Sequence, residues 1–285
     1  MTTFPQPRVD HVVLDTRDGM DEAVLAYETL GFQLTPRSRH SLGSINHLAV
    51  LEPAYLELLG FDPASNVVRA DIAQFPIGLN GLVFNTESAC ELFRDLNARG
   101  VPVEEPLAFS RTVNLSDGSA EAKFRVVRFK KAAVPFGRVY FCQHLTPDLI
   151  WRREWLRHPN GATGIECVSV ALRDPAAAAE QFSRIFGGDT VRQTPGGAWK
   201  LAAGNTEIEL FAIDTLQVQL GAAMPLPLGR TDFVARLIVR TESLARASEV
   251  LRAGAVPFIQ LESGRVLVPA ASGWNLAIEF VEVRP

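Results

Sequence analysis

The stretch DHVVLDT at residues 10–16 decides the fold, because three further versions of it recur along the chain. They are NGLVFNT (80–86), ECVSVAL (166–172) and ARLIVRT (235–241). Each run is short and rich in β-branched residues, which favours a partly buried strand. Their equivalent second positions, His11, Gly81, Cys167 and Arg236, are 70 residues apart in the first pair and 69 in the second. One segment of about 70 residues is therefore repeated four times.

An amphipathic helix is predicted after each of these strands. In the first unit, Ala23, Tyr27 and Leu30 share one helical face, and the other units repeat this spacing. Two or three short extended segments follow each helix, so the unit is a strand, a helix and three strands. Each predicted helix stops at a glycine, which can take the left-handed conformation that closes a helix end. The four glycines are Gly31, Gly100, Gly187 and Gly254.

The repeated unit predicts an α+β fold of two domains. Its helix covers one face of the sheet, so the other face needs a partner sheet or a ligand. Two units facing each other make a curved mixed sheet around a cavity. We therefore expect four β-α-β-β-β modules, at 8–61, 79–145, 164–213 and 231–285. They form domains over 8–145 and 164–285, joined by a linker over 146–163 that carries the turn signal Pro159-Asn160-Gly161.

The composition excludes several classes of protein. With 47% hydrophobic and 21% charged residues, the 285-residue chain is typical of a folded globular protein. A net charge of −4 offers no basic stripe for nucleic acid or an anionic membrane, and no run of about 18 apolar residues predicts a membrane span. The N-terminus lacks the pattern of a secretion signal, and the three cysteines have no CxxC spacing. We expect a cytoplasmic protein with reduced thiols and, without a glycine-rich phosphate motif, no nucleotide cofactor.

Polar residues inside the predicted strands indicate a site in the first domain. Because side chains alternate along a strand, His11 and Val13 line one face. In the last strand of the first unit, Leu56 and Leu58 most simply go under the helix, which leaves Glu57 on the concave side with His11. A carboxylate within a strand needs a reason, since an unpaired buried charge is costly. The equivalent positions of the other units hold Gln143, Glu209 and Glu279.

This unit, with His opening one strand and Glu closing another, resembles the vicinal oxygen chelate superfamily. Its members include glyoxalase I, extradiol dioxygenases, and bleomycin- and fosfomycin-resistance proteins. More narrowly, His40-Ser-Leu-Gly-Ser-Ile-Asn46 followed by Tyr55-Leu-Glu-Leu-Leu59 is similar to the bacterial glyoxalase-like domain family. Phe141-Cys-Gln-His-Leu-Thr-Pro147, Trp151 and His158-Pro-Asn-Gly-Ala162 also fit that family. The narrow resemblance spans about residues 9 to 170, and the superfamily pattern spans nearly the whole chain.

The resemblance implies a metal site in the first domain. In that superfamily, two facing units supply a first-strand and a last-strand residue each to one divalent metal. The matching positions here are His11, Glu57, Gly81 and Gln143. Glycine provides no ligand and the Gln143 amide is a weak one, so the implied ligands are His11, Glu57 and Gln143. The implied cofactor is a single divalent ion, namely Zn, Mn, Ni or Fe.

The second domain carries a different set at the same positions, which are Cys167, Glu209, Arg236 and Glu279. A guanidinium in the cavity repels a cation, so we expect no metal there. We expect Arg236 to pair with Glu209 or Glu279, which would satisfy their charges.

Two alternatives remain open for the first domain. In one, His11 and Glu57 are a hydrogen-bonded pair in a cup that has lost its metal. The other concerns Gln143 and His144, which are adjacent and so face opposite ways in a strand. The alignment favours Gln143 in the cup, whereas a β-bulge would bring in His144, a far better ligand.

Further residues are candidates for catalysis or substrate binding. Glu57 suits a catalytic base as well as a ligand, and the loop residue His40 is a candidate base because its charge changes near neutrality. Arg125 lies mid-strand and presents a fork suited to carboxylates or phosphates. The candidate substrate-binding residues are Asn46, Tyr55, Arg125 and His144.

The function expected from this resemblance is action on a small molecule in the cup of the first domain. The chemistry would be metal-assisted, of lyase, isomerase or dioxygenase type. The alternative is a resistance-like protein that binds and sequesters a small molecule without metal or catalysis. A small molecule is the expected partner in both cases, and a homodimer is a further expectation.

Overall fold

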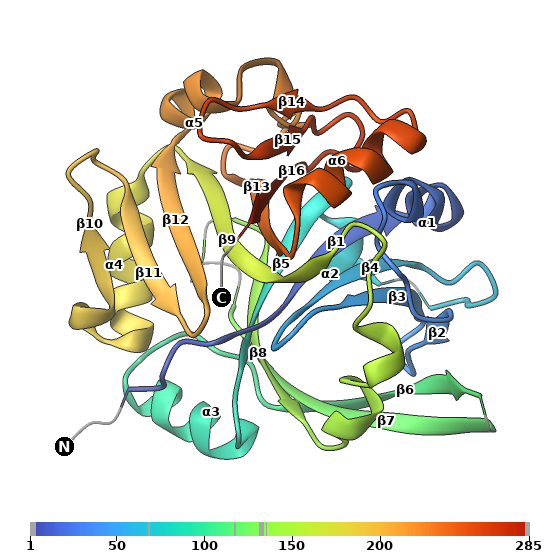
Figure 1. Ribbon diagram of the computed structural model, residues 1–285. Helices are drawn as coiled ribbons and strands as arrows, with labels where there is room; N and C mark the ends of the chain where they lie inside the picture. The colour runs from blue at the N-terminus through green and yellow to red at the C-terminus, as the bar shows by residue number, and fades with distance from the viewer. Residues whose placement is uncertain (1–3, 68, 117, 131–133, 135, 283–285) are drawn as a thin grey trace.

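The computed structural model describes residues 4–67, 69–116, 118–130, 134 and 136–282 (Figure 1). It contains two eight-stranded sheets with helices on their outer faces. This arrangement confirms the predicted α+β fold of four β-α-β-β-β modules. The last residues of the predicted fourth module, 283–285, lie outside the described residues.

The first domain is built from two modules that meet at the centre of one sheet. In the sheet order β2-β3-β4-β1-β5-β8-β7-β6, the central strands β1 and β5 are antiparallel. Strand β1 is parallel to β4, and β5 is parallel to β8. The first module comprises β1 (Val9–Arg17), α1 (Met20–Thr29), β2 (Ser38–Arg39), β3 (Ser44–Val50) and β4 (Tyr55–Phe61). A short helix that the sequence did not predict, α2 (Ala70–Ala73), leads to β5 (Gly78–Asn85), α3 (Ala89–Ala98), β6 (Leu107–Leu115), β7 (Gly118–Arg128) and β8 (Arg138–His144).

The second domain repeats this plan with the sheet order β10-β11-β12-β9-β13-β16-β15-β14. Its third module holds β9 (Ala162–Leu172), α4 (Pro175–Phe186), β10 (Val191–Gln193), β11 (Trp199–Ala203) and β12 (Thr206–Ala212). An unpredicted helix, α5 (Ile213–Leu220), precedes the fourth module. That module holds β13 (Phe233–Thr241), α6 (Leu244–Ala253), β14 (Ile259–Gln260), β15 (Val266–Val268) and β16 (Ala277–Glu282).

The four predicted glycines end the four module helices. Gly31, Gly100 and Gly187 have positive φ angles of +84°, +72° and +96°, a backbone region that favours glycine. At the fourth helix, Gly254 has φ −81° and the left-handed position falls one residue later, on Ala255. Glycine is therefore used for its backbone freedom at three of the four stops.

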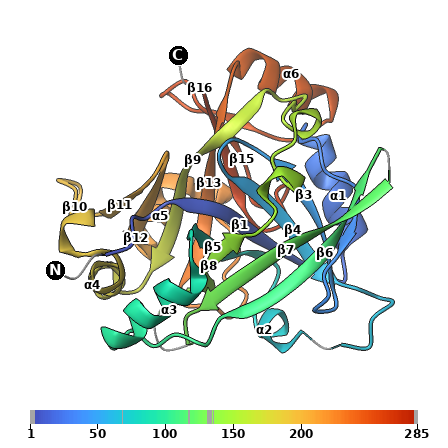
Figure 2. The same cartoon turned by 90° about the horizontal axis from the view of Figure 1, so that it is seen from below.

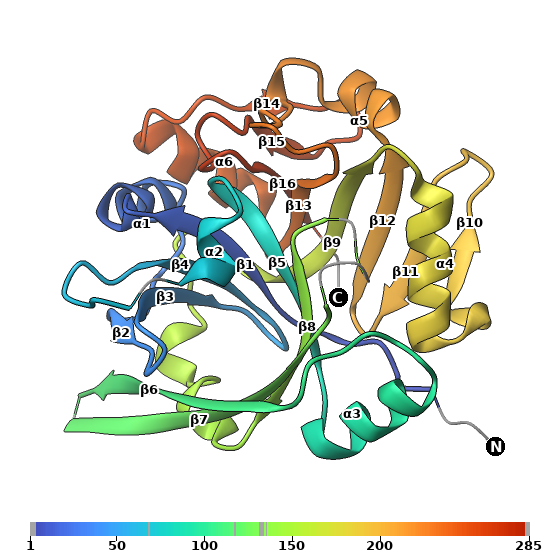
Figure 3. The ribbon, with the colours of Figure 1, turned by 180° about the vertical axis from the view of Figure 1, so that it is seen from behind.

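The first sheet closes on itself, which goes beyond the predicted curvature. Its two edges meet where His40 and Arg111 form an antiparallel bridge. The Ser41 amide donates to the Ser110 carbonyl at 2.8 Å beside that bridge. In Figures 1 and 3, β2 accordingly lies next to the β6–β7 hairpin. The concave face of the first domain is thus enclosed at this seam, and we call the enclosed space the cup.

The segment predicted as a linker covers part of the cup. It forms two short 3-10 turns, η1 (Pro147–Leu149) and η2 (Arg153–Trp155), before β9 begins. Ile150 and Trp155 are buried in one cluster with Val13 and Tyr55 from the concave face. The segment therefore packs on the first domain and is more than a connection.

The two domains share one hydrophobic core. On α4, Phe186 packs against Phe84 of β5 and Phe141 of β8, with ring centroids 4.7 and 5.7 Å apart. Figure 2 shows α4 beside α3 on that outer face. The second domain thus buries apolar surface of the first, which stabilises both. In the part of the chain that the structure describes, no helix combines the length and apolar character needed to cross a bilayer.

Candidate functional site

A β-bulge in β1 sets the geometry of the site. In the β1–β5 pairing, Val9 lies opposite Phe84 and His11 opposite Val83, so Asp10 is the extra residue. A bulge re-aims side chains that strict alternation would separate. The Asp10 carboxylate consequently reaches the His11 ring, and its Oδ1 lies 2.5 Å from His11 Nδ1.

Asp10 also bonds a second imidazole. Its Oδ1 lies 2.9 Å from His144 Nε2, and its Oδ2 accepts from Asn85 Nδ2 at 3.1 Å. Burial acts to raise the pKa of Asp10, but His144 and His11 outweigh it and hold that pKa below its usual range. An ionised carboxylate only accepts hydrogen bonds, so the His11 and His144 nitrogens that face it carry the hydrogens.

This contact orients His11 toward Glu57. With Nδ1 bonded to Asp10, His11 Nε2 faces the cup and lies 3.6 Å from Glu57 Oε2. The ring is stacked on Tyr55, with centroids 4.4 Å apart. The Tyr140 hydroxyl lies 3.4 Å from His11 Nε2, and burial raises the pKa of Tyr140, so the phenol keeps its proton. His11 and Glu57 are both buried, at 3% and 6% exposure.

The groups within 4 Å of the Glu57 carboxylate oxygens are an amide and two imidazoles. Asn46 Nδ2 donates to its Oε1 at 2.7 Å, and His40 Nε2 lies 3.7 Å from the same oxygen. Burial acts to raise the pKa of Glu57, but His40, His11 and the Asn46 hydrogen bond outweigh it, so that pKa lies below its usual value. Glu57 is therefore an ionised carboxylate with no arginine or lysine paired to it among the described residues.

His40 lies in the cup and not in a solvated loop. It sits at the seam of the sheet, where its Nδ1 is 2.9 Å from Ser44 Oγ. Burial lowers the pKa of His40 to about 4, with Glu57 opposing the shift. The imidazole is thus neutral near pH 7 and able to accept a proton.

Two predicted site residues lie on the wrong face of the sheet. Gln143 donates to the Glu87 carbonyl and accepts from the Ala89 amide at the start of α3, so its expected place in the cup is corrected. The reason is regular alternation in β8, which sends the adjacent His144 into the cup instead. Arg125 likewise points outward, where its Nη1 donates to Cys90 Sγ of α3 at 3.4 Å.

Gly81 has no room for a ligand side chain. A Cβ at this position would lie 2.5 Å from Val13 Cβ, on the strand opposite. Any side chain there would push β1 and β5 apart. Packing of the two central strands therefore explains the glycine in the third superfamily position.

The structure adds residues that sequence reasoning missed. Asp10 and Tyr140 contact His11, Arg111 lines the cup, and Trp151 packs on His144 with ring centroids 4.8 Å apart. Strand alternation would have indicated Tyr140, two residues from Cys142 and four from His144 on the same face. Asp10 could only have been found by foreseeing the bulge.

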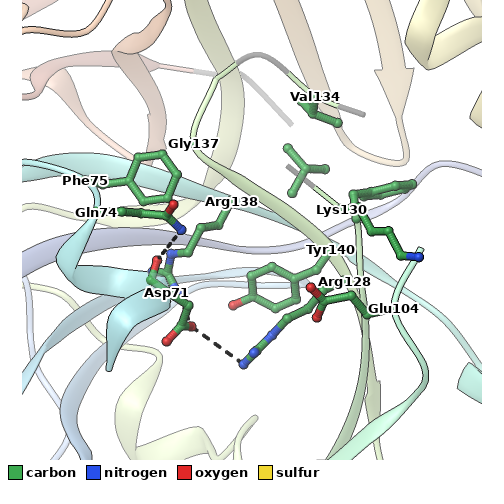
Figure 4. Close-up of a pocket in the computed structure, with 12 residues that line it drawn as sticks. Asp71, Gln74, Phe75, Glu104, Arg128, Lys130, Val134, Gly137, Arg138 and Tyr140 are labelled. Atoms are coloured by element: carbon green, nitrogen blue, oxygen red, sulfur yellow. Dashed lines mark hydrogen bonds and ion pairs between the residues drawn. The ribbon is translucent and has the colours of Figure 1, made fainter. Parts of the chain in front are cut away.

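The cup contains a small cavity with a larger one beside it. The first has a volume of about 40 Å³ and is lined by His11, His40, Glu57, Arg111 and Tyr140 among others. The second, of about 220 Å³, is shown in Figure 4 and shares Tyr140 as a wall. There Asp71 of α2 lies 3.7 Å from both Arg128 and Arg138, so its charges are largely paired.

The equivalent position of the second domain is closed by ion pairs. Arg236 donates to Glu279 at 3.0 Å and lies 3.4 Å from Glu209, as expected from the sequence. The guanidinium also contacts Ser169 Oγ at 3.1 Å. These bonds satisfy the charges without an ion, so the two domains differ at this position.

The first-domain residues fit a divalent ion in two places. Asp10, His11 and His144 place ligand atoms within 4.8 Å of one another, but hydrogen bonds already join those atoms. The other place is between His11 Nε2 and Glu57 Oε2. Two ligands about 2.1 Å from one ion lie at most about 4.2 Å apart, and these atoms are 3.6 Å apart. An imidazole with a carboxylate on its other nitrogen is a frequent metal ligand.

The fold is the one that the sequence resemblance predicted, the fold of the vicinal oxygen chelate proteins. The family model described as "Glyoxalase-like domain" matches residues 9–186, more than half of the chain. The chain therefore belongs to the glyoxalase-like domain family. No curated protein matches it.

Solved structures share the fold at low sequence identity. A hypothetical protein from Staphylococcus aureus aligns with a TM-score of 0.66 and 13% identity, over 97% of this chain and 99% of its own. A mutant of 4-hydroxymandelate synthase from Streptomyces coelicolor gives 0.58 and 13%, over 98% and 93%. A fusion of a xylose isomerase-like TIM barrel with 4-hydroxyphenylpyruvate dioxygenase gives 0.59 and 12%, over 98% of this chain and 50% of its own.

Proposed function

We propose that this chain is a glyoxalase-type enzyme that acts on a small molecule in the cup of the first domain. The carrying observation is the buried pair His11 Nε2 and Glu57 Oε2, 3.6 Å apart, with Asp10 bonded to the far nitrogen of His11. In the proposal, His11 and Glu57 hold one divalent ion. When bound, such an ion supplies Lewis-acid stabilisation to oxygens of the substrate.

The chain's own residues have distinct parts in this proposal. Asp10 bonds His11 Nδ1 and so turns Nε2 toward the cup. Neutral His40, 3.7 Å from Glu57, is placed to accept a proton from the substrate. Lyase and isomerase chemistry fit this arrangement because each develops charge on a substrate oxygen, whereas dioxygenase chemistry would also need O2 and a redox-active ion such as Fe or Mn.

The side chains and the volume of the small cavity bear on the choice between catalysis and simple ligand binding. Phe109, Phe124 and Tyr55 line the cavity and exclude water, which strengthens electrostatic interactions inside it. A cavity of about 40 Å³ is far smaller than the 300 Å³ or more that a drug-sized ligand occupies. For the alternative of a resistance-like protein that sequesters a small molecule without metal, the cavity therefore restricts the ligand to a few non-hydrogen atoms.

Metal analysis of the purified protein tests the proposal. We expect about one divalent ion per chain, lost in His11→Ala and retained in the matched outer-face variant Gln143→Ala. A protein that stays empty after soaking in Zn, Mn, Ni and Fe would contradict it. Thermal-shift screening with small α-ketoaldehydes, in the presence and absence of metal, then separates the functions. Stabilisation that requires metal supports the enzyme, and stabilisation without metal supports a binding protein.

A further inference from the structure

Arg111 of β6 is a buried cation with no carboxylate within ion-pair distance among the described residues. The residue is 3% exposed and lines the small cavity with His40 and Glu57. Among the described residues, its side chain makes one hydrogen bond, from Nη1 to Ser38 Oγ at 2.8 Å. Its Nη2 is buried and has no hydrogen-bond partner in that part of the chain. The guanidinium therefore has a donor without an acceptor among the described residues.

A second arginine in the same cavity, Arg69, has hydrogen-bond acceptors for all three nitrogens of its guanidinium. Arg69 donates from Nε and Nη2 to the two carboxylate oxygens of Asp71, both at 2.9 Å, and from Nη1 to Ser44 Oγ. Both arginines are buried, but only Arg69 has a carboxylate. Burying an unpaired charge costs several kcal/mol, so Arg111 is an unfavourable residue for stability alone.

The local structure holds Arg111 in this position. Its backbone forms the bridge to His40 that closes the sheet, and its Cζ lies 5.9 Å from the centre of the Phe124 ring. Closure of the seam thus places a fixed guanidinium on the same cavity as His40 and Glu57. A guanidinium presents a planar fork that matches the two oxygens of a carboxylate.

We propose that Arg111 binds the carboxylate of a small organic acid, and that this acid is the substrate of the cup. The inference rests on the proposed function and adds the class of its substrate. The acid would supply the missing acceptor for Arg111, while the rest of the molecule lies toward His11 and Glu57. The volume of the cavity restricts the acid to a few non-hydrogen atoms unless side chains move.

Thermal unfolding of the full chain with acetate and with its neutral isostere acetamide tests the proposal. We expect acetate to raise the Tm and acetamide to leave it unchanged. Arg111→Gln should weaken acetate binding about 10- to 100-fold, the range for hydrogen bonds to a charged group. The matched control Arg125→Gln, on the outer face of the neighbouring strand, should keep the response of the wild type.

The Tm values of the Arg111 variants without acetate provide a second readout, which does not depend on how tightly acetate binds. Because Arg111→Gln removes a buried charge that has no carboxylate in direct contact and only Glu57 across the cavity, its Tm without acetate should equal or exceed that of the wild type. Arg111→Lys retains the charge without the fork and should respond to acetate less than the wild type does. Equal responses to acetate and acetamide, no response to 100 mM acetate in the wild type, or a full response in Arg111→Gln would overturn the proposal.

These results are independent of the metal test. If the protein binds no ion but the acetate response depends on Arg111, the proposed metal-assisted function fails and the carboxylate site stands. If His11→Ala loses its ion while acetate has no effect, the metal site stands and the substrate class is wrong.

Discussion

Replacing Asp10 by asparagine removes the negative charge that two buried imidazoles share. Asp10 bonds His11 Nδ1 at 2.5 Å and His144 Nε2 at 2.9 Å, and both bonds involve an ionised acceptor. Hydrogen bonds to a charged group contribute about 1.5–3 kcal/mol each. The neutral amide can accept from one imidazole, so about one bond and the charge are lost. We expect Asp10→Asn to lower the free energy of unfolding by about 2–4 kcal/mol at pH 7.

The same substitution should weaken metal binding. Loss of the carboxylate behind a ligating histidine typically lowers metal affinity by about 10- to 100-fold. Urea unfolding followed by tryptophan fluorescence measures stability, and titration with Zn²⁺ measures affinity. The exposed residue Asp148 provides a control, since Asp148→Asn should change stability by less than about 0.5 kcal/mol.

The pH dependence gives the result that would refute this reasoning. The pKa of Asp10 in the folded protein lies below its unfolded value. Its contribution is therefore fully present above pH about 4 and is lost as the pH falls below that value. The difference in unfolding free energy between the wild type and Asp10→Asn should therefore become smaller as the pH falls below about 4. A difference under about 0.5 kcal/mol at pH 7, or one that stays constant down to pH 2, would show that the carboxylate does not hold the imidazoles.

Three other substitutions test separate parts of the structure. Burial raises the pKa of Asp15 from 3.8 to about 6, so the free energy of unfolding of the wild type should fall as the pH rises between these two values. Asp15→Asn should remove this fall when unfolding is measured as a function of pH. Curves of unfolding free energy against pH that run parallel for the two proteins would contradict the prediction. Gly81→Ala, whose Cβ would lie 2.5 Å from Val13 Cβ, should lower the free energy of unfolding in urea by about 1–3 kcal/mol. The control Gly188→Ala, which has open space around the added Cβ, should leave it unchanged. Equal effects of the two substitutions would refute the packing argument. Gln143→Ala should lower the free energy of unfolding by about 1 kcal/mol without changing the metal content. Loss of the ion in this variant would show that Gln143 is a metal ligand in the cup after all.

The fold could be predicted from the sequence because the repeat is local and periodic. Strand alternation, helical faces and glycine stops depend on residues close together in the chain, and four copies reinforce each other. Closure of the first sheet could not be predicted, because it depends on contacts between residues far apart in the sequence, namely His40 with Arg111 and Ser41 with Ser110. These contacts enclose the cup at the seam.

The site was partly predictable for the same reason. His11 and Glu57 follow from alternation and from the family resemblance, and the structure places them side by side. Asp10 did not follow, because one extra residue in β1 changes which side chains share a face. For Gln143 the reason is different, because β8 is regular at that point. Alignment of the repeated units favoured Gln143 in the cup, but regular alternation places its neighbour His144 there. Bulges depend on how two strands pair, so a single strand's sequence does not reveal them.

The most direct test is a crystal structure of the full chain soaked with Zn²⁺, with diffraction data collected at the zinc absorption edge. We predict one anomalous peak in the cup, about 2.0–2.2 Å from both His11 Nε2 and a Glu57 oxygen, with Asp10 still bonded to His11 Nδ1. A cup without a peak, or a peak among Asp10, His11 Nδ1 and His144, would contradict the assignment of His11 and Glu57 as the metal ligands.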